Sequence, residues 1–162
     1  MQDFWKVILF LGMVIVILIA FIKPINKLLG GYDNCFICTP LHFNGYFSNW
    51  TITHYLAFLI VGYLAPKHIV LIIFLGIAWE VTEVYMEYIS KTQHDHVLVK
   101  LLNLNCDTKL TPDQFWKHYF GVRKFHRKKT LFWCSGGFFG SVVDIIADIA
   151  GAYSGIYLSK IL

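Results

Sequence analysis

The chain has 162 residues, of which 57% are hydrophobic and 17% aromatic, and it carries a formal net charge of +4 at neutral pH. An apolar excess of this size excludes an ordinary soluble domain, and it predicts one small all-α integral membrane domain over residues 1–162.

Four apolar segments approach the length of about 20 residues that a helix needs to cross about 30 Å of hydrocarbon. They cover residues 4–22, 46–65, 68–89 and 131–162. The first has a longer apolar run than the roughly 7 to 15 residues of a secretory signal, and no small-residue cleavage site follows it. It is therefore predicted to be an anchor helix, and the whole chain to contain about four transmembrane helices.

The segments divide the chain into an anchor helix and linker (1–30), a region with two helices that carry His54 and the WEVTE stretch (31–90), a basic loop (91–130) and a last helix rich in Asp and Gly (131–162). Nine of the 14 Lys and Arg residues lie in the loop. The positive-inside rule predicts that this loop is cytoplasmic. We interpret it as a solvated loop attracted to anionic lipid, without a role in nucleic-acid binding.

The four cysteines offer little chemistry of their own. Cys35 and Cys38 form a C-x2-C pair, whereas Cys106 and Cys134 stand apart. A structural zinc site needs a second ligand pair, which the spacing does not provide. Reduced thiols near the membrane surface are the expected state on the cytoplasmic side.

Five of the ten acidic residues fall inside apolar segments, namely Glu80, Glu83, Glu87, Asp144 and Asp148. A charged side chain at the centre of a membrane helix costs about 2.5–3.5 kcal/mol on insertion scales. The three glutamates share one helix face, and so do the two aspartates. Glu87 lies near the end of its segment, and its carboxylate is predicted to reach water at the interface.

His54 lies in a third helix at a comparable depth, so the sequence predicts a polar intramembrane site shared by three helices. Carboxylates close together in a low dielectric cannot all remain ionised unless a cation joins them. Oxygen donors without cysteine suit calcium or magnesium better than zinc. Glu80, Glu83, Asp144 and Asp148 are therefore predicted metal ligands, and His54 is the predicted catalytic proton carrier. The alternative is that the acids fix helix contacts in a structural membrane protein.

The last helix contains Gly140, Gly151 and Gly155 on the stripe that carries its two aspartates, and such spacing lets two helices approach closely. Its sequence GSVVDIIAD matches half of the CDP-alcohol phosphotransferase signature. The other half, D-x2-D-G-x2-A-R, is absent, which excludes that enzyme class.

The stretches GYDNC, THYLAF and AWEVTE, in that order, are similar to the base-exchange phosphatidylserine synthases of eukaryotes. The resemblance covers about residues 32–158. The family has Asn at the position of Asp148, and its preceding acid stands five residues earlier rather than four. The matching residues are Tyr32, Asn34, Cys35, His54, Tyr55, Trp79, Glu80, Thr82, Glu83, Asp148, Gly151 and Gly155.

This resemblance implies an enzyme of an endoplasmic-reticulum-type membrane that exchanges the choline or ethanolamine head group of a phospholipid for L-serine. It implies that calcium is required and that no nucleotide is consumed. In this interpretation His54 transfers a proton, while Glu80, Glu83 and an acid of the last helix bind calcium. Phospholipid and L-serine are the implied partners, and four helices around a lipid pocket are compatible with a homodimer. The implied substrate-binding residues are Asn34, Trp79, Thr82 and Gly151.

The spacing of Asp144, Asp148, Gly151 and Gly155 equally resembles the D-x3-N-x2-G-x3-G tail of VanZ-like membrane proteins. That family also has a His at a helix start and a Glu in a later helix, and it is tied to glycopeptide resistance. A VanZ-like or structural multi-pass membrane protein without exchange chemistry is therefore the alternative.

Overall fold

The computed structural model describes residues 40–42, 47–102, 109–121 and 137–162, together with Trp5, Ile8, Leu9, Gly12 and Met13 near the N-terminus. The described part is mostly helical, as predicted. A short antiparallel pair of strands, which was not predicted, precedes the first long helix. The elements are β1 (Pro40–His42), β2 (Phe47–Ser48), α2 (Asn49–Leu64), α3 (Ile69–Thr92), α4 (Val97–Leu102), α5 (Pro112–Phe120) and α6 (Gly137–Ile161).

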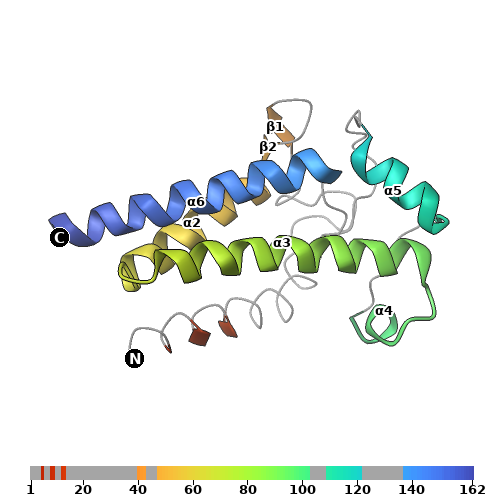
Figure 1. Cartoon of the computed structure of the whole chain (residues 1–162), viewed down its shortest axis with the longest axis horizontal. Coiled ribbons are helices and arrows are strands. Elements are labelled where there is room, and N and C mark those ends of the chain that lie inside the picture. Colours follow the sequence, from red (N-terminus) through yellow and green to blue (C-terminus); the bar gives the residue numbers. More distant parts are fainter. Residues whose placement is uncertain are drawn as a thin grey trace, which may run out of the picture.

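Three long helices form the body of the structure. α3 and α6 run in opposite directions along the longest axis, and α2 lies against α6 (Figure 1). α4 and α5 lie at the end where α3 finishes and α6 begins (Figure 1). The bundle therefore has one end formed by the α2–α3 turn and the α6 C-terminus, and an opposite end that carries the short helices.

Two helices, α3 with 24 residues and α6 with 25, are long and apolar enough to cross a membrane. α3 extends past the predicted end at residue 89. The prediction that the second segment crosses the membrane is not confirmed, because α2 has 16 residues and a length of about 24 Å at about 1.5 Å per residue, shorter than the hydrocarbon layer. The predicted anchor helix over residues 4–22 lies almost entirely outside the described residues.

The start of α2 is fixed by a capping arrangement at Ser48. Its hydroxyl accepts a hydrogen bond from the backbone N–H of Trp50 at 3.2 Å, and its own N–H donates to Oγ1 of Thr51 at 3.4 Å. These bonds satisfy backbone donors that the first helical turn would otherwise leave unpaired. The helix consequently begins three residues later than the predicted segment, at Asn49.

The α2–α6 contact is close because glycines allow it. A Cβ added at Gly151 would collide with the backbone carbonyl of Tyr55, and one added at Gly155 would collide with that of Leu59. The close approach predicted from the glycine spacing is thus confirmed for these two positions. Gly140 takes no part in it, since a Cβ there would have nothing within 4 Å.

Residues 91–130, predicted to be a basic loop between membrane segments, contain helices in their described part. α3 continues to Thr92, and α4 and α5 follow. Thr111 caps α5 reciprocally with Gln114, and Pro112 occupies the first turn, where its missing N–H costs nothing. α5 then buries Phe115 and Tyr119 against the longer helices. Residues 103–108 and 122–130, which hold most of the basic run, lie outside the described residues.

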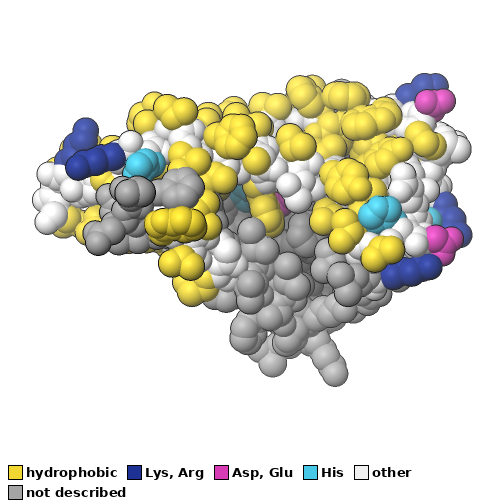
Figure 2. Space-filling view, turned by 60° about the horizontal axis from the view of Figure 1, so that its bottom comes forward, with side chains coloured by type: hydrophobic (Ala, Val, Ile, Leu, Met, Phe, Trp, Pro, Cys, Tyr) yellow, Lys and Arg dark blue, Asp and Glu magenta, His cyan; other side chains and the backbone are white. Residues whose placement is uncertain are grey.

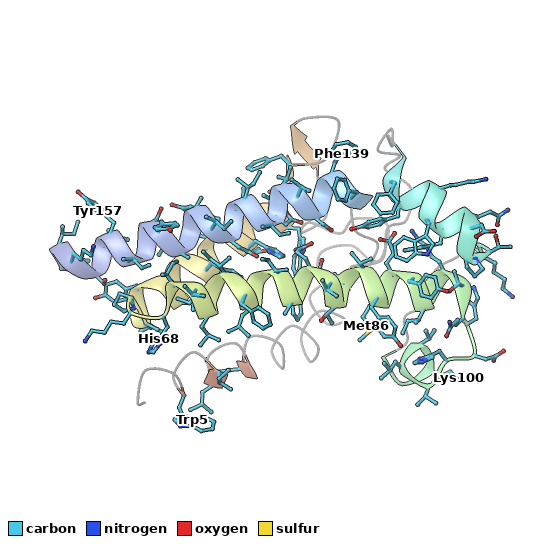
Figure 3. All side chains as sticks on the ribbon, in the orientation of Figure 1. Trp5, His68, Met86, Lys100, Phe139 and Tyr157 are labelled. Carbon is cyan, nitrogen blue, oxygen red and sulfur yellow. The ribbon has the colours of Figure 1, made fainter. Side chains whose placement is uncertain are left out.

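The surface of the described part is apolar between its two ends. Among the residues that Figure 2 colours, apolar side chains cover most of the face, and the Lys and Arg side chains lie at its two ends (Figure 2). His68 and Lys100 mark opposite ends of the α3–α4 region (Figure 3). Within the described residues, the exposed charged side chains are Lys67, Asp95, Lys100, Lys109, Asp113, Lys117 and Lys160.

Candidate functional site

Five ionisable side chains from three helices meet in the interior of the bundle. α2 contributes one, α3 two and α6 two, and none is more than 8% exposed. The helix spacings that put the acids on common faces explain why all five point inward. The cluster, named the acid–histidine cluster below, consists of His54, Glu80, Glu83, Asp144 and Asp148.

His54 lies between acids from both long helices. Its Nδ1 is 2.9 Å from Oδ1 of Asp148 and 3.7 Å from Oε1 of Glu80. The ring of Trp50, one turn earlier in α2, meets the imidazole edge-on at a centroid distance of 5.1 Å. The hydrogen bond with Asp148 holds the imidazole in one orientation, with Nδ1 as the donor when it carries the proton.

Asp144 is held by a residue that sequence reasoning missed. The hydroxyl of Thr51 donates to Oδ1 of Asp144 at 2.5 Å, and both side chains are buried. The capping role of Thr51 is readable from its spacing after Ser48, but its partner in α6 depends on how the helices meet. Thr51 therefore joins the N-terminus of α2 to the acid–histidine cluster.

Three members of the cluster converge closely enough to hold one metal ion. Ligand atoms of His54, Glu80 and Asp144 all lie within 4.8 Å of one another. Glu83 and Asp148, which were also predicted to be metal ligands, are outside this group. The donor set of two carboxylates and one imidazole accepts hard cations such as calcium, magnesium or manganese through its oxygens, whereas the imidazole also suits softer metals.

Several carboxylate oxygens in the cluster lack hydrogen bonds of normal geometry within the described part of the chain. Both oxygens of Glu80, Oε1 of Glu83 and Oδ2 of Asp148 are buried and without such a partner, although the Ser141 hydroxyl lies near Glu80. Buried polar atoms are nearly always paired, so this many acceptors in one place fit a cation.

A second hydrogen-bonded link reaches the cluster from α5. The hydroxyl of Tyr119 donates to Oγ of Ser141 at 3.3 Å, and both side chains are buried. Because Ser141 lies near the Glu80 carboxylate, this link connects α5 to the acid–histidine cluster. Neither residue was predicted, since no spacing in the sequence pairs α5 with the start of α6.

Glu87 corrects one prediction from the sequence. Rather than reaching water, its side chain is fully buried and is bonded to the ammonium group of Lys91, one turn later. The acid thus belongs to a separate ion pair at the end of α3. The i, i+4 spacing of Glu and Lys is a favourable helical pair and was visible in the sequence.

The substrate-binding residues implied by the resemblance do not all lie at the cluster. Trp79 directly precedes Glu80 and is partly buried, whereas Thr82 is exposed and donates to the backbone carbonyl of Ala78 at 2.8 Å. Gly151 lies in the α2–α6 contact. Asn34 lies outside the described residues, as do all four cysteines.

Comparisons of the chain with models of protein families, with curated proteins and with solved structures gave no match.

Proposed function

We propose that this chain is a membrane-embedded enzyme that exchanges phospholipid head groups, making phosphatidylserine from phosphatidylcholine or phosphatidylethanolamine and L-serine with calcium. The observation that carries the proposal is the convergence of His54, Glu80 and Asp144 within 4.8 Å in the interior of an apolar helical bundle. A proton carrier beside a set of hard-cation ligands is what substitution at a phosphodiester requires.

The distribution of polarity supports placement in a membrane. The described helices expose large apolar side chains such as Val70, Phe74 and Val81 and bury their acids. Charged residues inside membrane helices generally face the interior of a bundle and mark functional sites. We propose that residues 4–22 and α2 complete a set of four membrane segments with α3 and α6. In this arrangement the basic segment 91–130 faces the cytoplasm of an endoplasmic-reticulum-type membrane.

The proposed reaction is a substitution at phosphorus without a change in oxidation state. The hydroxyl oxygen of L-serine bonds to phosphorus, and the bond from phosphorus to the choline or ethanolamine oxygen breaks. His54 accepts the proton from the serine hydroxyl and returns it to the departing alcohol. Asp148 holds the imidazole through Nδ1 and stabilises the imidazolium that forms between these two transfers.

Glu80 and Asp144 would hold the calcium ion, with Thr51 fixing the carboxylate of Asp144. When bound, calcium neutralises charge on the phosphodiester oxygens. Neither oxygen of Glu80 has a hydrogen bond of normal geometry within the described residues, and this supports the role, because buried carboxylate oxygens without such bonds are otherwise costly.

The proposal is tested by substituting the proton carrier and a cation ligand separately. His54→Ala and Glu80→Gln are each expected to abolish incorporation of labelled serine into lipid, while the protein still inserts and elutes as a single species. His68→Ala is the matched control. His68 is the N-cap residue of α3, in the turn that follows α2, and its side chain makes no capping hydrogen bond. Retained exchange in both site variants would show that the proposal is wrong.

A second candidate, a VanZ-like or structural membrane protein, is favoured by the backbone contacts of Gly151 and Gly155. In that case the acids serve helix assembly. The same site variants would then fail to assemble, and the unaltered protein would bind no divalent cation.

A further inference from the structure

Aromatic rings from three helices form a continuous row at the end of the bundle that carries α5 (Figure 1). Trp116 of α5 stacks on Tyr88 of α3 with the ring centroids 5.9 Å apart, and on Phe120, one turn later in α5, at the same distance. Phe120 in turn contacts the ring of Phe138, at the start of α6, with a centroid distance of 5.5 Å. The row, named the aromatic strip below, consists of Tyr88, Trp116, Phe120 and Phe138.

The aromatic strip is exposed, although other rings of α5 are buried. α5 buries Phe115 and Tyr119 against the longer helices, whereas Trp116, Phe120 and Phe138 are 43%, 58% and 42% exposed. Single exposed apolar side chains are common on protein surfaces, but a contiguous apolar patch marks a surface that binds a protein or a membrane. The packing of the bundle therefore does not account for the strip.

The strip lies at the level where two helices of membrane-crossing length would leave the hydrocarbon. The middle of α3 falls between residues 80 and 81, and Tyr88 lies about 11 Å beyond it at about 1.5 Å per residue. Phe138 precedes the middle of α6 by about 16 Å on the same basis. Half of the hydrocarbon thickness is about 15 Å. Both ends of the strip are consequently close to the boundary between acyl chains and head groups.

The residue types at the strip suit this boundary. Trp and Tyr join an apolar ring to a polar group and are enriched at head-group level, whereas the exposed residues nearer the middle of the long helices include Val81 and Ile146. Lys109 and Lys117, before and within α5, are exposed. In sequence, the segment 91–130 carries nine Lys and Arg residues against three Asp. This excess of positive charge matches an anionic lipid surface.

We infer that the aromatic strip docks into the head-group boundary of an anionic lipid leaflet and holds α5 at the membrane surface. The inference rests on the membrane placement in the proposed function, but not on the exchange reaction. A protein surface is the competing occupant. The bilayer is favoured because the strip continues the exposed apolar surface of α3 and α6, which would face lipid in the same placement.

The test measures the depth of Trp116 in the purified full-length chain, reconstituted in vesicles of phosphatidylcholine and phosphatidylglycerol. Part of the phosphatidylcholine carries bromine, which quenches indole emission on contact, either near the head group or near the end of the acyl chain. The Trp116 signal is the difference in emission between the unaltered chain and Trp116→Phe. We expect bromine near the head group to remove more of this signal than bromine near the chain end.

Two variants that add an indole provide the matched comparison. Phe120→Trp places it in the strip and should follow Trp116, so it decides the question even where Trp116→Phe does not fold. Val81→Trp places it at the middle of α3, where the native side chain is 63% exposed. Its added emission should be quenched more by bromine near the chain end.

The inference would be overturned if bromine near the chain end quenched the strip more strongly, or if aqueous iodide quenched it and bromine did not. Protection of the strip from both quenchers would also overturn it, because protein would then cover the rings. Loss of bromine quenching at Val81→Trp as well would contradict the membrane placement itself. Shallow quenching of the strip without serine exchange would retain the docking surface and contradict the enzyme.

Discussion

The hydroxyl of Thr51 donates a hydrogen bond to Oδ1 of Asp144 across 2.5 Å, and this bond joins the first turn of α2 to the interior face of α6, about two turns after α6 begins. The same hydroxyl oxygen accepts the backbone N–H of Ser48 at 3.4 Å. One side chain thus caps a helix and fixes the position of a proposed cation ligand. The start of α2 and the geometry of the acid–histidine cluster are consequently linked.

We predict that Thr51→Val lowers both calcium affinity and serine exchange, whereas Thr51→Ser retains them. Valine matches the shape of threonine but leaves a buried carboxylate oxygen without its donor, a loss of about 1–3 kcal/mol. Calcium titration and initial exchange rates measured on the two variants provide the check. Equal behaviour of the Val and Ser variants would mean that the hydrogen bond has no functional part.

Asp148 offers a graded test of how His54 is held. In Asp148→Asn the amide oxygen can still accept a hydrogen bond from Nδ1, so exchange is expected to fall by about tenfold, corresponding to about 1.4 kcal/mol. In Asp148→Ala no acceptor remains, and the fall is expected to be much larger. Comparable rates in both variants would show that the carboxylate does not orient the imidazole.

The α2–α6 contact predicts opposite outcomes for the same substitution at two glycines. Gly155→Ala forces a methyl group into the backbone of α2 and is expected to cost about 1–3 kcal/mol of stability. Gly140→Ala meets nothing within 4 Å and is expected to be neutral or stabilising, since alanine favours helix over glycine. Thermal unfolding in detergent measures both. A loss at Gly140 equal to that at Gly155 would contradict the described contact.

The Glu87–Lys91 pair predicts a compensation between two substitutions. Lys91→Met leaves the fully buried Glu87 carboxylate without its cation and is expected to destabilise the chain by about 3–5 kcal/mol. Adding Glu87→Gln removes the stranded charge and should recover most of that loss. Glu87→Gln alone should be milder, because a lysine can extend its ammonium group toward water. Additive losses in the double variant would exclude a direct pair.

Calcium is expected to stabilise the folded protein as well as to support exchange. A ligand that binds only the folded state at about 100 times its Kd adds about 2.7 kcal/mol. The midpoint of thermal unfolding should rise with calcium in the unaltered chain and stay constant in Glu80→Gln. A rise of the same size in Glu80→Gln would place the bound ion elsewhere.

Much of this site could be predicted from the helical spacing of its residues, because that spacing is read directly from the sequence. The spacings of Glu80 with Glu83, and of Asp144 with Asp148, fix a shared helix face whatever the rest of the chain does. Glycines at Gly151 and Gly155 likewise predict a close contact before any partner is known. These features depend on the geometry of a single helix.

The features that were missed depend on how separate helices meet. The Thr51–Asp144 and Tyr119–Ser141 bonds join residues that are 93 and 22 positions apart, and no single-helix period encodes them. Glu87 was misplaced for a related reason. Its depth was judged from the end of the apolar run, whereas α3 continues past that point and is covered by α4 and α5.

The central claim is tested most directly by incorporation of labelled L-serine into lipid by the purified chain in vesicles of phosphatidylcholine or phosphatidylethanolamine. Each lipid is assayed with calcium and with a chelator, for the unaltered chain and for His54→Ala. The account predicts labelled phosphatidylserine that requires calcium and disappears in the variant. Absence of product from both lipids, with a folded and inserted protein, would contradict it and leave the acid–histidine cluster as a binding or helix-assembly feature.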